Sequence, residues 1–140
     1  MGLDLAIRNG TIVDGSGAPR FQADIGIQDG QIVEIGRIRS GASQVIDAEG
    51  HMVAPGFIDG HTHMDAQVAW DPLGSCSCWH GVTSVIMGNC GFALAPCQPD
   101  QREWIARCLE AVEDIPTEAM MAGINWTWET FPEYLDNVDK

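Results

Sequence analysis

The feature that most constrains this chain is an apolar run that ends in two histidines separated by one residue. Residues 52–65 read MVAPGFIDGHTHMD, with His61 and His63 at the polar end. Residues two apart on a β-strand point to the same side, so the two imidazoles can face one point. Because neutral imidazole is a good ligand for zinc and similar metals, we expect His61 and His63 to form half of a metal site.

A second candidate ligand follows the next apolar run. Residues 82–87 read VTSVIM, a pattern typical of a buried strand in a parallel sheet, and Gly88, Asn89 and Cys90 come directly after it. The ends of such strands carry the active sites of (β/α) barrels. A thiolate together with two imidazoles suits zinc, so Cys90 is the third candidate ligand. The alternative is an incidental histidine pair on a loop, with Cys90 as a small buried apolar residue.

Two carboxylates flank the histidine pair. Asp59 and Asp65 are candidates for orienting a histidine through a hydrogen bond, although polar residues at a strand end are the preferred interpretation of both. Cys76 and Cys78 resemble half of a cysteine-based zinc site. Their spacing to the later cysteines fits no structural zinc pattern well, so this remains the weaker alternative.

Composition excludes several classes of partner. The 140 residues suit one domain, and 45% hydrophobic residues are enough to bury a core. A net charge of −13 argues against nucleic acid and anionic membranes as partners. We found neither a transmembrane run nor a signal-peptide pattern, and the five cysteines are an odd number, so we expect a cytoplasmic protein with reduced thiols.

The order of elements predicts an α/β chain in two parts. Alternating apolar residues with turns at 9–10, 29–30 and 47–50 predict a small antiparallel β module over residues 1–54. Residues 55–140 read as the first βα units of a parallel-sheet domain, with strands near 57–63 and 82–87. A helix is expected to begin at Asp100 as N-cap, and capping residues predict another after Thr130.

These strings resemble a known family. The segments DLAIRNGTIVDGSG and IDAEGHMVAPGFIDGHTHMD resemble the amino-terminal part of the amidohydrolase superfamily. The segments SCWHGVTSVIMGNCGFALAPC, VEDIP and WTWETFPEYL are similar to those of its N-acyl-D-amino-acid deacylases, also called D-aminoacylases. The resemblance implies a zinc-dependent hydrolase that releases D-amino acids from N-acyl-D-amino acids, built as a (β/α)8 TIM barrel with a small β-sandwich.

The resemblance also implies roles for individual residues. His61 and His63 match the family's histidine pair on the first barrel strand, and Cys90 matches its cysteine ligand on the second. The remaining ligands and the general-base aspartate of the family are expected beyond Lys140, so we expect no catalytic residue in these 140 residues.

A chain with only the first strands of a barrel is expected to be inactive and to need another copy or the missing carboxy-terminal portion. A non-catalytic interaction or scaffold protein and a small cysteine-based metal-binding module are the alternatives.

Overall fold

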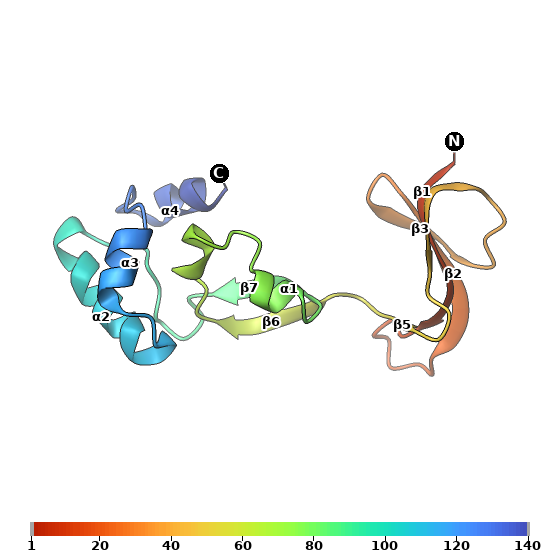
Figure 1. The fold of residues 1–140 in the computed structure, drawn as a ribbon, viewed down its shortest axis with the longest axis horizontal. Coiled ribbons are helices and arrows are strands. Elements are labelled where there is room, and N and C mark those ends of the chain that lie inside the picture. Colours follow the sequence, from red (N-terminus) through yellow and green to blue (C-terminus); the bar gives the residue numbers. More distant parts are fainter. Residues whose placement is uncertain (1, 140) are drawn as a thin grey trace. The chain divides into compact units, whose positions relative to one another are not determined.

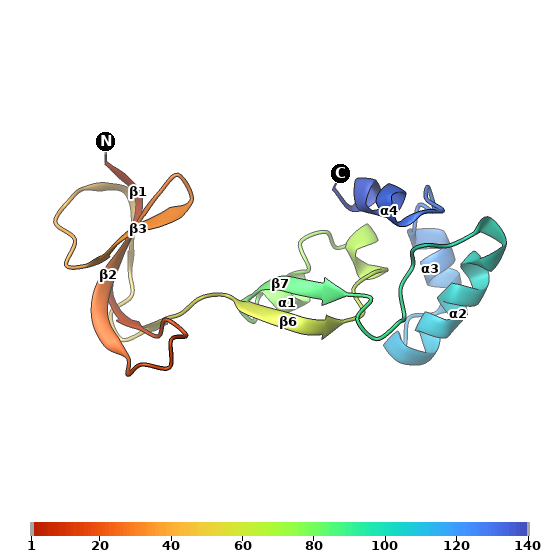
Figure 2. The same ribbon diagram turned by 180° about the vertical axis from the view of Figure 1, so that it is seen from behind.

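The structure, a computed structural model, describes residues 2–139. The chain divides into two compact units, Met1–Pro55 and Gly56–Lys140. In Figures 1 and 2 the first unit carries β1 to β5 and the second carries β6, β7 and the helices. Among the described residues, no helix has the length and apolar character needed to cross a membrane.

The first unit is a mixed sheet. Its strands are β1 (Leu3–Ile12), β2 (Phe21–Gln28), β3 (Gln31–Gly36), β4 (Ala42–Asp47) and β5 (Met52–Val53). They lie in the order β3-β2-β1-β4, and β5 also pairs with β1. The pairings of β1 with β2 and of β2 with β3 are antiparallel, whereas β4 and β5 run parallel to β1. The prediction of an antiparallel module is therefore wrong for β4 and β5, because the segment after β3 carries the chain to the other side of β1.

The two turns predicted in the first half of this unit have different outcomes. At Asp29-Gly30 both residues have positive φ, 51° and 72°, as a tight hairpin between β2 and β3 requires. Asn9-Gly10, by contrast, does not end a strand, and the predicted turn is wrong. The register between β1 and β2 shifts there, Asn9 has φ 60°, and its N–H donates to the Asp24 carboxylate at 2.9 Å. This is a β-bulge within one long strand.

The first unit has a small core. Leu3, Ala6 and Ile38 form it, with Ala42 packed against them. Within the described residues of this unit the strands form one sheet, not two facing sheets. The sandwich-like part of the fold prediction is thus not confirmed and stays a prediction.

The second unit combines a parallel strand pair with helices, which confirms the α/β class. Its elements are β6 (Phe57–Thr62), η1 (Gln67–Ala69), α1 (Ser75–Cys78), β7 (Val82–Met87), η2 (Pro99–Gln101), α2 (Arg102–Glu113), α3 (Thr117–Gly123) and α4 (Phe131–Val138). Strands β6 and β7 are parallel, with Phe57 opposite Val82 and Thr62 opposite Met87. The described residues contain these two barrel-type strands and no closed barrel.

Helix starts were predicted with mixed success. The capping box at Thr130 and Glu133 that opens α4 is confirmed. Asp100 as N-cap of α2 is wrong, because the residue lies in the short η2 turn and the cap is Gln101, whose side chain makes no capping hydrogen bond. The 3-10 turn Pro99–Gln101 moves the start of the α-helix forward by one residue.

A buried cluster joins the ends of the two parallel strands to the helices. Its members are Ala66, Leu94, Ala106, Leu109, Met120, Ile124, Trp128 and Tyr134. Trp128 is 2% exposed, and its indole N–H donates to the Leu94 carbonyl at 2.9 Å. The cluster therefore fixes the segments that follow β6 and β7 against α2, α3 and α4.

Candidate metal centre

The carboxyl ends of β6 and β7 meet at one edge because the strands are parallel. Two side-chain hydrogen bonds tie these ends together. The buried Thr62 hydroxyl donates to the Ile86 carbonyl at 2.9 Å, and the Asn89 amide donates to the Gly60 carbonyl at 2.8 Å. The residues that follow β7 are thereby held beside the histidine end of β6.

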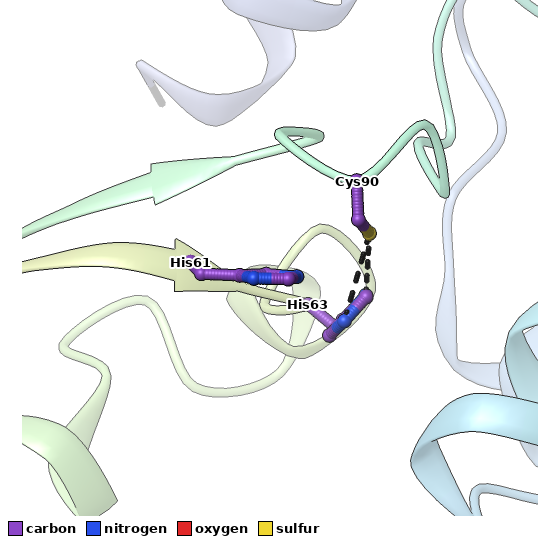
Figure 3. Close-up of side chains that lie close together, drawn as sticks. All are labelled: His61, His63 and Cys90. Atoms are coloured by element: carbon purple, nitrogen blue, oxygen red, sulfur yellow. Dashed lines mark hydrogen bonds between the residues drawn. The ribbon is translucent and has the colours of Figure 1, made fainter.

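His61, His63 and Cys90 come together at this edge. One donor atom from each lies within 4.8 Å of the others. The Cys90 sulfur is 3.5 Å from Nδ1 and 3.6 Å from Nε2 of His63, and the two imidazole centroids are 5.3 Å apart. Figure 3 shows the sulfur directed at the His63 ring, with the His61 ring beside it. Within residues 2–139 no other three His, Cys, Asp or Glu side chains bring their donor atoms together in this way.

The donor set and its spacing fit zinc. Thiolate and imidazole are common zinc ligands, with bonds of about 2.3 and 2.0–2.1 Å. A tetrahedral ion with those bonds would place the sulfur about 3.6 Å from the ligating nitrogen. The Cys90 sulfur is already that close to His63, but it is about equally far from both ring nitrogens, so the His63 ring must turn before one nitrogen faces a shared ion. The His61 side chain is exposed, which leaves it room to turn toward the same ion.

The two segments that carry the candidate ligands enter the buried cluster a few residues further along the chain. Ala66 comes three residues after His63 and Leu94 four residues after Cys90, and both are fully buried in that cluster. Phe92, between Cys90 and Leu94, packs near the His63 ring with centroids 6.1 Å apart. Both ligand-bearing segments therefore rest on a packed base, which reduces the entropy lost when the side chains gather around an ion.

The two flanking carboxylates occupy different environments. Asp59 accepts a hydrogen bond from the backbone N–H of His61 at 3.2 Å and so acts on the strand end, not on an imidazole. Asp65 is 4% exposed, and its Oδ2 makes no hydrogen bond. Burial raises the pKa of Asp65, and nearby backbone N–H groups and His63 offset part of that rise. Tyr134 donates to the backbone carbonyl of Asp65 at 3.2 Å, which anchors the segment after His63.

The cysteines of α1 lie apart from this group. Cys76 and Cys78 are exposed. The Gln67 amide donates to the Cys76 sulfur at 3.1 Å, and this hydrogen bond lowers the pKa of the thiol. The structure brings neither cysteine into the three-donor group at the strand ends.

Sequence reasoning missed one acidic residue that reaches the site. Glu113, the last residue of α2, places Oε1 3.7 Å from Nδ1 of His63. No spacing rule links a helix end to a histidine 50 positions earlier in the chain. Thr62, by contrast, could have been found from strand alternation, which turns it to the side opposite the histidines.

Comparison with known proteins connects this geometry to one family. The model of the amidohydrolase family matches residues 44–140, and the urease alpha-subunit N-terminal domain matches residues 1–57. D-aminoacylase of Alcaligenes xylosoxydans is 35% identical over 95% of this chain and 25% of its own length.

Solved structures agree with the family match. The crystal structure of N-acyl-D-glutamate deacylase from Bordetella bronchiseptica, complexed with zinc and a phosphonate inhibitor, is 34% identical with a TM-score of 0.79. The match covers 99% of this chain and 27% of the deacylase. A D-aminoacylase structure with a binuclear metal centre is 30% identical, with a TM-score of 0.73 over 96% of this chain and 26% of its own. This chain spans about a quarter of the length of these relatives, and it belongs to the amidohydrolase family.

Proposed function

We propose that this chain supplies the first metal ligands of a zinc-dependent hydrolase that cleaves the amide bond of N-acyl-D-amino acids. His61, His63 and Cys90 hold the zinc. The observation that carries the proposal is the convergence of their donor atoms within 4.8 Å beyond two parallel strand ends, in a chain of the amidohydrolase family. Relatives of this chain include N-acyl-D-glutamate and N-acyl-D-aspartate deacylases, which supports the substrate class.

The chemistry of the donor set agrees with hydrolysis. When bound in such a site, zinc polarises a carbonyl and lowers the pKa of water. The residues of this chain hold and orient that ion, and the bonds from Thr62 and Asn89 keep the two ligand-bearing segments at a fixed separation. Among the described residues we assign no general base, so the 140 residues alone are proposed to bind metal without turnover.

The architecture proposed for the complete active unit is a (β/α) barrel that begins with β6 and β7. Matches to the solved deacylases support it, since they cover nearly all of this chain but only about a quarter of each deacylase. A second copy or a further portion of a longer protein would supply the remaining strands. The first unit would then contribute to the small β-sandwich.

Zinc binding by the full chain tests the proposal. We expect the purified protein to bind one zinc ion, measured by competition with a chromophoric chelator and by elemental analysis after gel filtration. Replacing Cys90 with serine removes the thiolate and should weaken binding by at least about tenfold, whereas Cys76→Ser should bind as the unaltered chain does.

Two results would contradict the proposal. Equal zinc affinity in the Cys90→Ser and unaltered chains would remove Cys90 from the site, and loss only in Cys76→Ser would favour a cysteine-based module at α1. Hydrolysis of N-acetyl-D-methionine by the 140 residues, abolished by a chelator, would contradict the absence of a general base.

A further inference from the structure

Glu113 connects the helical part of the second unit to the candidate metal centre. Its Oε1 lies 3.7 Å from Nδ1 of His63, and the two side chains are only 26% and 18% exposed. That separation is about 0.7 Å longer than a typical N–H···O hydrogen bond. The two groups therefore lie close enough for a change of side-chain rotamer to bring them into a hydrogen bond.

The position of Glu113 resolves an ambiguity at His63. The Cys90 sulfur is almost equally far from the two ring nitrogens, at 3.5 and 3.6 Å, so it does not determine which nitrogen faces an ion. Glu113 approaches Nδ1. A carboxylate near Nδ1 accepts a hydrogen bond from Nδ1–H and so stabilises the tautomer with hydrogen on Nδ1, which leaves the lone pair of Nε2 free.

We infer that Glu113 is a positioning residue: it accepts a hydrogen bond from Nδ1–H of His63 and thereby presents Nε2 to the metal. This rests on the proposed function for the ion, whereas the hydrogen bond between Glu113 and His63 requires no metal. Metal-bound histidines commonly donate their second ring N–H to a carboxylate, and loss of such a partner typically costs about 10- to 100-fold in metal affinity.

The local structure holds Glu113 in place. Residue 113 ends α2, and Asp114 follows in the left-handed region with φ 54°, its N–H bonded to the Glu110 carbonyl at 3.2 Å. Ala106 and Leu109 on the same helix are buried in the cluster that also contains Ala66 and Leu94. The helix that carries Glu113 and the segments that carry the ligands therefore share one packed core.

Nitrogen-15 NMR of histidine-labelled, zinc-free full chain tests the inference directly. The spectra would be recorded at pH 8.5. We expect His63 to carry its proton mainly on Nδ1 in the unaltered chain and to shift toward the Nε2-protonated form in Glu113→Ala. His61, which Glu113 does not approach, serves as the internal reference.

Zinc affinity gives the second readout. We expect Glu113→Ala to bind zinc at least about tenfold more weakly and Glu113→Gln to lie between it and the unaltered chain, because the amide oxygen still accepts a hydrogen bond but carries no charge. Glu103→Gln removes the same charge from the same helix, where the carboxylate pairs with Arg107, and should leave both readouts unchanged.

The outcomes separate this inference from the proposed function. An unchanged His63 tautomer in Glu113→Ala overturns the role of Glu113, whatever the zinc result. A tautomer shift in a chain that binds no zinc supports Glu113 and contradicts the metal proposal. Equal losses of affinity in the Glu113 and Glu103 variants would indicate a general effect of charge and would also overturn the specific role.

Discussion

The two ends of the β6–β7 pair lie in contrasting surroundings. At the carboxyl ends, Thr62 is buried and bonded across to β7, and the segments that follow both strands enter the largest buried cluster of the described residues. At the amino end of β6, Phe57 and Ile58 are 64% and 71% exposed. One end is thus supported by packing within the unit, and the other presents apolar side chains to solvent.

This contrast separates the packing that supports the candidate ligands from the packing that covers the strands. The candidate ligands need a rigid base, and the helices of the same unit provide it through Trp128, Leu109 and their neighbours. A two-stranded parallel sheet normally has both faces covered, and the described residues do not supply that cover to β6. The site can therefore be organised locally even though the sheet that bears it is not complete.

The largest expected effect comes from weakening the supported end. Trp128→Ala removes a fully buried side chain and the donor to the Leu94 carbonyl, so we expect a loss of about 3–5 kcal/mol in the free energy of unfolding of the second unit. Urea denaturation followed by circular dichroism measures it. Trp79→Ala, at an 82% exposed position, should change that free energy by no more than about 0.5 kcal/mol. Similar losses in both variants would show that the cluster does not hold this end.

The exposed end should control self-association. The double variant Phe57→Thr, Ile58→Thr places a β-branched residue, which favours strands, at both positions but removes apolar area. We expect its dimerisation constant, measured by sedimentation velocity, to weaken by about tenfold or more, since burial of each original side chain contributes about 1.5–3 kcal/mol. Leu73→Thr changes an exposed apolar residue outside the strands and is the matched control. Equal association constants in the unaltered chain, the double variant and Leu73→Thr would mean that β6 does not form the surface of self-association.

The candidate site was the part of the molecule most accessible to sequence reasoning. His61 and His63 share one side of a strand because alternation has a period of two, and Cys90 follows the next apolar run, so their meeting needs only two parallel neighbours. Whether they bind metal stays a prediction. Glu113 could not be foreseen, because its approach to His63 depends on the path of the chain through α2 and on packing against the cluster.

In the fold, sequence signals succeeded where local chemistry decides the structure. The hairpin at Asp29-Gly30 needs two positive φ angles, and the side chains of Thr130 and Glu133 bond the free backbone N–H groups at the start of α4. Both features are as predicted. Asn9-Gly10 carries the same kind of signal as Asp29-Gly30 but forms a bulge, because the Asp24 carboxylate receives the freed N–H and β1 continues to pair beyond it. Strand direction in β4 likewise depends on a long-range crossover and not on its own residues.

The smallest expected effect concerns the start of α4, which leads into the supported end through Tyr134. The Glu133 carboxylate accepts hydrogen bonds from the backbone N–H groups of Glu129 and Thr130, each at 2.9 Å, and these bonds lower its pKa below the usual 4.5. A lowered pKa in the folded state means that the charged carboxylate stabilises the fold above the unfolded-state pKa, and that this stability is lost as pH falls through the folded-state value. Glu133→Gln keeps an acceptor without the charge, so we expect it to be slightly less stable than the unaltered chain at pH 7 and the difference to be smaller at pH 3. Parallel denaturation curves at the two pH values measure the difference, and a gap that widens on acidification would contradict the role assigned to the charged capping box.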